Sequence, residues 1–275
     1  MKRIDAFKTI IYIVLTVICL AMVFPLIPLI FASFKGHTEF YDSGPLTPPK
    51  NWFNFHNFYL AWTQGDLVRG FFNTGILLSA SLVGTIMIGT MTAYAIDRFD
   101  FRGKKVVVWA FLVATLVPGV TTQVATFQII EKLNLYNTRW AAVLLYMGTD
   151  ILSIYIFLQF MQSIPKALDE SARIDGASHF TIFFRIIFPL LRPAIATVII
   201  IKGIAYYNDF YTAYLYMPDP SLGTVSTSLF RFIGPFSASW QVICAATLLV
   251  ITPTIIVFLA LQKFIYKGLS AGAVK

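Results

Sequence analysis

The stretch Ser163–Pro193, SIPKALDESARIDGASHFTIFFRIIFPLLRP, is polar and charged, yet it lies between two long apolar segments. Gly176 can take the left-handed conformation that ends a helix, and Ser178 can cap the helix that follows. Pro189 is expected to close that second helix. The pattern therefore predicts a short helical hairpin over residues 163–189 that lies on one face of a membrane.

The composition around this hairpin is that of a membrane protein. The 275-residue chain is 57% hydrophobic and 12% charged, whereas soluble domains carry about 25% charged residues. A bilayer core about 30 Å thick needs roughly 20 apolar residues to cross it. The segments that meet this requirement are 9–34, 70–96, 106–130, 140–164, 193–217 and 240–262. We therefore expect an all-α membrane protein, with a single transmembrane domain of six helices over residues 1–275.

The basic residues predict the orientation of these helices. With both termini in the cytoplasm, 13 Lys and Arg residues lie in cytoplasmic segments and 6 in outer ones. The positive-inside rule then predicts an N-in, C-in topology and a cytoplasmic hairpin. The net charge of +8 reflects this bias, so nucleic acid is not an expected partner. Cys19 and Cys244 lie in apolar segments and the histidines are scattered, so no metal site is predicted.

Small and acidic side chains along the hairpin favour docking into a groove on another protein. Asp169 and Glu170 lie near the start of its first helix, where the helix dipole favours anions. Glu170 and Asp175 can pair with basic groups at the rim of a groove. The alternative is a hairpin that lies on lipid headgroups, which favours more Lys and Arg. The expected docking residues are Asp169, Glu170, Ser171, Ala172, Asp175, Gly176, Ala177 and Pro189.

The hairpin also resembles a known signature. Glu170-Ser171-Ala172, Asp175-Gly176-Ala177 and Ile186–Pro189 resemble the EAA motif of ABC importer permeases. Ser171 replaces an Ala and Phe188 replaces a Leu of that motif, but the spacing is intact. Other segments resemble the maltose-type carbohydrate-uptake permeases: Asn73-Thr74, Ala93-Tyr94-Ala95, residues 98–105, Val117-Pro118-Gly119, Leu135-Tyr136-Asn137-Thr138, Asn208-Asp209-Phe210 and the tail 268–275.

The resemblance implies the second, shorter permease of a heterodimeric sugar importer, with the type I ABC importer permease fold, in a bacterial inner membrane. Its implied partners are a homologous permease, an ATPase subunit pair and an extracytoplasmic solute-binding protein, with a carbohydrate as substrate. The hairpin is implied to insert into the ATPase, whose closure swings the membrane helices from inward-facing to outward-facing.

The resemblance also implies a transport subunit that is not an enzyme. The sequence agrees, because the G-x-x-x-x-G-K-[ST] phosphate-binding pattern is absent. The step Gly103-Lys104 has Arg98 where the pattern needs glycine. No cofactor is therefore expected on this chain, and ATP and Mg belong to the partner ATPase.

Polar and helix-bending residues inside the spans mark a candidate substrate path. Pro118 frees the carbonyl of Ala114 and bends the third span, beside Gln123. An ionised Asp150 in the fourth span costs about 3 kcal/mol, so it faces either a water-filled cavity or a hydrogen-bonding partner on another helix. The candidate path residues are Pro118, Gln123, Asp150, Tyr207, Asn208 and Asp209, with helix packing or an interfacial aromatic belt as the alternative roles.

The fifth span contains two charged residues. Lys202 and Asp209 are seven residues apart and share a helix face, and Lys202 can snorkel toward the interface. Together with Asp150 they allow an alternative function, an ion- or proton-coupled secondary transporter that needs no ATPase.

The second span carries small residues at every fourth position, which predicts close packing against another helix. They are Ser81, Thr85, Gly89 and Ala93.

Overall fold

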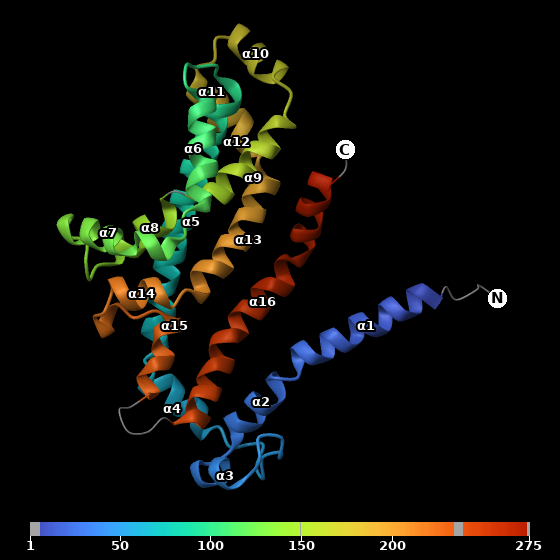
Figure 1. The fold of residues 1–275 in the computed structure, drawn as a ribbon, viewed down its shortest axis with the longest axis vertical. Coiled ribbons are helices and arrows are strands. Elements are labelled where there is room, and N and C mark those ends of the chain that lie inside the picture. The colour runs from blue at the N-terminus through green and yellow to red at the C-terminus, as the bar shows by residue number, and fades with distance from the viewer. Residues whose placement is uncertain (1–5, 149, 234–238, 274–275) are drawn as a thin grey trace. The chain divides into compact units, whose positions relative to one another are not determined.

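The computed structural model describes residues 6–148, 150–233 and 239–273 (Figure 1). The described residues form helices and contain no strand, as the composition predicts. The end of the tail motif, residues 274–275, lies outside this part of the chain. The chain divides into two compact units, Met1–Val68 with Ser228–Pro253, and Arg69–Thr227 with Thr254–Lys275.

The first unit joins the amino-terminal helices to the start of the last helix. Its small core contains Ala61, Val242 and Ala246. The helices are α1 (Ala6–Val23), α2 (Leu26–Phe34), α3 (His37–Asp42), α4 (His56–Gln64), the 3-10 turn η3 (Leu229–Phe232) and the beginning of α16 (Trp240–Ala273).

The second unit contains the predicted hairpin and most of the remaining helices. Phe157, Met161, Ile182 and Ile187 are at the centre of its largest core. The helices are α5 (Leu67–Arg98), α6 (Lys104–Leu116), α7 (Gly119–Lys132), α8 (Arg139–Met147), α9 (Ile151–Gln162), α10 (Ala167–Ile174), α11 (His179–Ile182), the π segment η1 (Phe183–Ile187), α12 (Phe188–Leu190), α13 (Arg192–Asn208), α14 (Tyr211–Tyr216), η2 (Pro220–Leu222) and α15 (Val225–Ser228).

Helix length and hydropathy identify three unbroken membrane spans among the described residues, Lys8–Phe34, Leu67–Arg98 and Trp240–Ala260. Three bent helix pairs bring the number to six if each pair is one span. The chain is thus a multi-pass membrane protein. The exposed apolar side chains of α1 fit this reading, because lipid solvates them as well as a protein core does.

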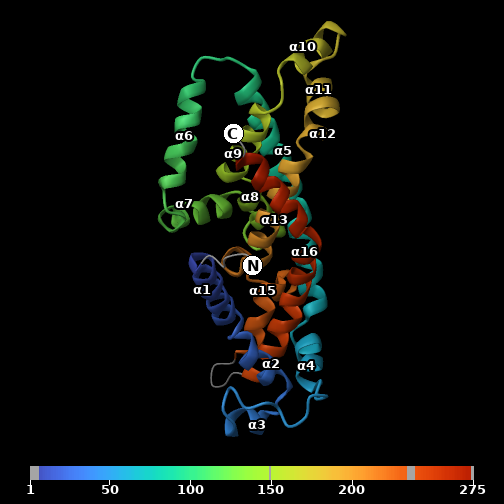
Figure 2. The same cartoon turned by 90° about the vertical axis from the view of Figure 1, so that its right-hand side faces the viewer.

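Three expected spans are broken: the fourth divides into α8 and α9, which are bent by 42°, and the third and fifth are broken at specific residues. The third does not merely kink: α6 and α7 meet at 104° (Figure 2), because Val117 and Pro118 are extended and proline cannot continue the helical hydrogen bonding. The fifth was expected to reach residue 217. Instead α13 ends at Asn208, since Asp209 is extended and its carboxylate accepts from the backbone of Thr212 at the start of α14.

Pro189 lies one residue before the end of the helical run His179–Leu190, close to the limit predicted for the second helix of the hairpin. Its missing N–H falls within this run, directly after the π segment η1, in which the Phe188 N–H donates to the Phe183 carbonyl. The chain continues to Leu191, and a bend of 70° then leads into α13.

Candidate coupling hairpin and transport path

The turn of the hairpin has the geometry that its glycine predicts. Gly176 has a φ of +81°, and its N–H donates to the Arg173 carbonyl at 2.9 Å. The N–H of Ala177 donates to the Ala172 carbonyl, also at 2.9 Å. These two bonds form a Schellman motif that satisfies the end of α10. Ser178 then caps α11 by accepting from the N–H of Thr181 at 3.2 Å.

Asp169 anchors the hairpin inside the subunit. Its carboxylate lies 3.0 Å from the Arg98 Nε, and both side chains are 2% exposed. Arg98 also donates to the Ile164 carbonyl at 2.9 Å, and the Tyr94 hydroxyl donates to Asp169 at 3.4 Å. Arg98 is also paired with Asp97 at 2.5 Å, so removing Arg98 would leave two largely buried carboxylates without their cation. Asp169, expected at the docking surface, therefore joins α10 to the end of α5.

The outer face of the hairpin combines acidic and apolar side chains. Leu168, Ile174 and Phe180 are 42%, 87% and 69% exposed, and sequence reasoning missed them, although large apolar residues in a charged segment were the available signal. The exposed residues of the expected docking set are Glu170, Ser171, Asp175 and Gly176. Ala172 is buried, whereas Ala177 and Pro189 are half-buried.

A hydrogen-bond network lies at the opposite end of α5. The amide of buried Asn73 donates to the carbonyls of Ser221 and Gly223, each at 2.9 Å, and its oxygen accepts from Arg139 at 2.8 Å. The N–H of Asn137 donates to the Tyr216 carbonyl at 2.9 Å. Two segments of the resemblance, Asn73-Thr74 and the turn containing Asn137, thus meet here. Asn73 and Arg98 are 25 residues apart on α5, so this network lies about 38 Å along the helix from the residue that holds the hairpin.

The candidate path residue Asp150 has a partner on another helix. Its carboxylate lies 2.6 Å from the Lys202 Nζ, and the two side chains are 10% and 18% exposed. Asp150 also caps α9, because it accepts from the backbone and the hydroxyl of Ser153. Lys202 therefore pairs with a carboxylate rather than snorkelling.

A tyrosine pair connects α8 with α13 beside this ion pair. The rings of Tyr146 and Tyr206 stack with centroids 4.5 Å apart. The Tyr206 hydroxyl donates to the Tyr146 carbonyl at 2.7 Å and lies 3.1 Å from the Thr85 hydroxyl. Tyr207 hydrogen-bonds with Thr254, and Asn208 is exposed at the end of α13. Of the expected path residues, Asp150 and Tyr207 thus contact side chains of other helices.

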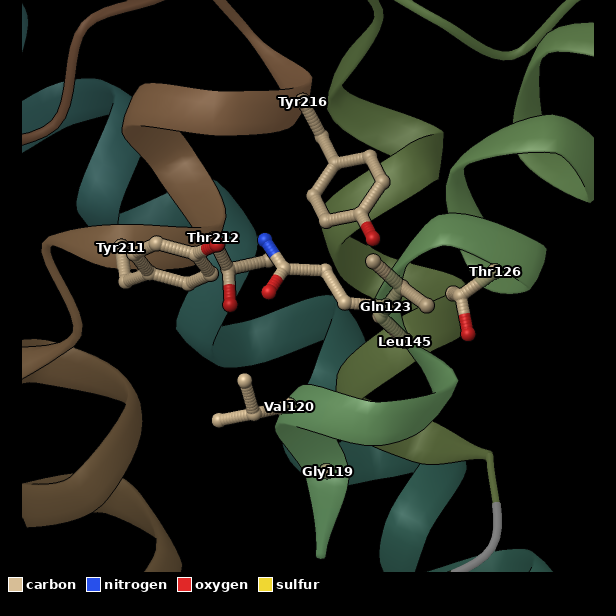
Figure 3. Close-up of a pocket in the computed structure, with 8 residues that line it drawn as sticks. All are labelled: Gly119, Val120, Gln123, Thr126, Leu145, Tyr211, Thr212 and Tyr216. Carbon is tan, nitrogen blue, oxygen red and sulfur yellow. The ribbon is translucent and has the colours of Figure 1, made fainter.

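An open cleft of about 600 Å³ lies between α7 and α14 (Figure 3). Of the candidate path residues, only Gln123 lines it, although Pro118 directly precedes Gly119 at its edge. The lining residues are Gly119, Val120, Gln123, Thr126, Leu145, Tyr211, Thr212 and Tyr216.

Comparison with known proteins agrees with this architecture. Residues 86–271 match the family model described as the binding-protein-dependent transport system inner membrane component. The chain is 34% identical to a melibiose, raffinose and stachyose import permease of Bacillus subtilis over 81% of each chain. It is 33% identical to a trehalose/maltose transport system permease of Thermococcus litoralis, over 96% of this chain and 94% of that one. A crystal structure of a bacterial ABC transporter for the polysaccharide alginate contains a chain with the same fold, at a TM-score of 0.83 and 19% identity, over 96% of this chain and 98% of that one.

The chain belongs to the binding-protein-dependent transport system inner membrane component family, the permease subunits of ABC importers. Members of this family are transport components, so this subunit is not an enzyme. The predicted permease fold and importer function are therefore confirmed.

Proposed function

We propose that this permease forms half of the path by which a sugar or oligosaccharide enters a bacterial cell across the inner membrane. A second homologous permease forms the other half, and an extracytoplasmic solute-binding protein delivers the substrate. A separate ATPase pair binds ATP and Mg and drives transport through the hairpin at residues 163–189. Sugar-importing relatives at 33–34% identity support the substrate class.

The observation that carries the coupling proposal is that the hairpin is both anchored and exposed. The buried Arg98–Asp169 pair fixes α10 to α5, so a push on the hairpin is transmitted to a long membrane helix. Glu170 and Ile174 remain exposed and offer charge and apolar surface to an ATPase groove.

The ion-coupled alternative is not favoured, because its coupling groups already have partners. Asp150 and Lys202 neutralise each other at 2.6 Å. Asp209 caps α14 through the N–H of Thr212 at 3.0 Å. A carrier of that class needs carboxylates that bind and release the driving ion.

The coupling proposal is tested with Glu170→Lys and Gly176→Val in the complete importer. Charge reversal removes the acidic contact, and a β-branched residue at φ +81° is strained and distorts the turn. We expect normal membrane insertion, about tenfold less ATPase co-purification and a parallel loss of uptake. The matched control is Glu131→Lys, an exposed acid on α7, which should leave both measurements unchanged. Unchanged ATPase recovery in both hairpin variants would refute the coupling role.

A further inference from the structure

The cleft between α7 and α14 contains polar groups that the fold itself does not use. Tyr216 is 4% exposed, with its ring 6.0 Å from that of Phe127. No described residue hydrogen-bonds to its hydroxyl or to the amide of Gln123. Both groups point into the space between the two helices (Figure 3). Because no described side chain occupies these groups, water or a ligand in the cleft completes their hydrogen bonds.

The remaining lining residues specify the chemistry of that ligand. Val120 and Leu145 provide apolar walls, and Tyr211, 53% exposed, provides an accessible aromatic ring. Thr212 adds a hydroxyl that already donates to Asp209 but retains acceptor capacity. An aromatic face with amide and hydroxyl groups suits the apolar face and the hydroxyls of a sugar ring. The volume of about 600 Å³ is within the range of small-molecule sites, about 300–1,000 Å³.

The charge of the cleft distinguishes between classes of sugar. None of the described lining residues carries a charge, and the nearest acid in the hydrogen-bond network is Asp209, bonded to Thr212. A uronic acid would therefore bring a carboxylate to a site that offers no cation and has an acid behind its wall, with an unfavourable desolvation energy.

We propose that this cleft is a subsite for a neutral carbohydrate, with the Gln123 amide and the Tyr216 hydroxyl as the groups that bind sugar hydroxyls. This inference rests on the proposed function, sugar import, and adds to it both the residues of this subunit and the selection against acidic sugars. Gln123 and Tyr216 are binding residues, whereas Asp209 is a positioning residue that orients Thr212.

The test is saturation-transfer NMR on the complete importer in nanodiscs, without its solute-binding protein. The neutral probes are maltotriose and raffinose, and the acidic probe is trigalacturonate. We expect transfer to at least one neutral probe and none to trigalacturonate. Tyr216→Phe and Gln123→Leu should each weaken neutral binding about fivefold, the loss of one ordinary hydrogen bond. Tyr216→Phe keeps the ring contact with Phe127, so folding is preserved.

Matched controls lie on the same helices but outside the cleft. Tyr214→Phe on α14 and Gln128→Leu on α7, both at exposed positions, should retain the wild-type affinity. Equal binding of trigalacturonate, wild-type affinity in both cleft variants, or no binding of either neutral probe by an importer that transports sugar would overturn the subsite. An importer whose ATPase is coupled but which transports no carbohydrate would instead overturn the proposed function.

Discussion

Asp150 and Asp169 show how the surroundings of a single residue decide its role. Both are acids in regions of expected function, one inside a span and one in the hairpin. Each is paired with a cation from another helix, Lys202 or Arg98. The sequence allowed a partner for Asp150 without indicating which, and it carried no sign of a partner for Asp169, because the pairs join helices that are distant in the chain.

The Asp150–Lys202 pair predicts a non-additive effect of substitution. Lys202→Met leaves a carboxylate unpaired in the membrane domain and should lower the free energy of unfolding by about 3 kcal/mol. Adding Asp150→Asn removes the remaining charge and keeps an N-cap for α9, so the double variant should recover most of the loss. Urea unfolding in mild detergent measures both. A double variant less stable than Lys202→Met alone would contradict this account.

At the scale of an element, small residues let α5 pack closely against its neighbours. The residues predicted to pack lie at such contacts. Ser81, Thr85 and Ala93 are buried, and Gly89 faces α9. A Cβ added to Gly89 would lie 2.9 Å from the Phe157 ring, and Phe157 is itself fully buried. This close approach explains why the stripe needs a glycine at that position.

Two glycines of α5 are therefore expected to respond differently to substitution. Gly89→Ala forces Phe157 to move and should destabilise the protein by about 1–3 kcal/mol. Gly75→Ala meets no atom within 4 Å and should be neutral or stabilising by up to about 1 kcal/mol, because alanine favours the helix. Thermal unfolding of the two purified variants gives the comparison. Equal midpoints would show that the α5–α9 contact is loose.

The helix breaks show where sequence patterns stop being sufficient. The motif Val117-Pro118-Gly119 predicts a bend, yet nothing local distinguishes a mild kink from the 104° corner between α6 and α7. At Asp209 the apolar pattern continues, but the carboxylate caps α14, and α13 ends at Asn208, well before the expected limit at residue 217. Both outcomes depend on which conformation the neighbouring helices stabilise.

At the scale of the whole molecule, α5 connects the hairpin with the Asn73 network. Its carboxyl end holds the hairpin through Arg98, and its amino end holds the Asn73 network with the loop around Ser221. Arg98 and Asn73 are 25 residues apart on this helix, about 38 Å, which is more than the thickness of the bilayer core. The positive-inside bias predicts that the hairpin end is cytoplasmic.

Labelling from each side of the membrane tests this orientation. In a background with Cys19 and Cys244 replaced by Ala and without the ATPase, Glu170→Cys should react with an impermeant maleimide only in inside-out vesicles. Asp219→Cys, in the exposed loop at the other end, should react only in right-side-out vesicles. Reaction of both from the same side would refute the topology, and reaction of Glu170→Cys from the outer side would also refute the coupling proposal.

The sequence by itself determined that this is a helical membrane protein, with a hairpin that turns at Gly176 and restarts at Ser178, because hydrophobic transfer and backbone conformation depend on near neighbours in the chain. Only the tertiary structure decided which acid anchors the hairpin, which lysine neutralises Asp150 and which tyrosine joins Gln123 in the cleft. Those pairings arise between helices distant in sequence, where burial makes an unpartnered charge or hydroxyl costly and the fold decides what lies beside it.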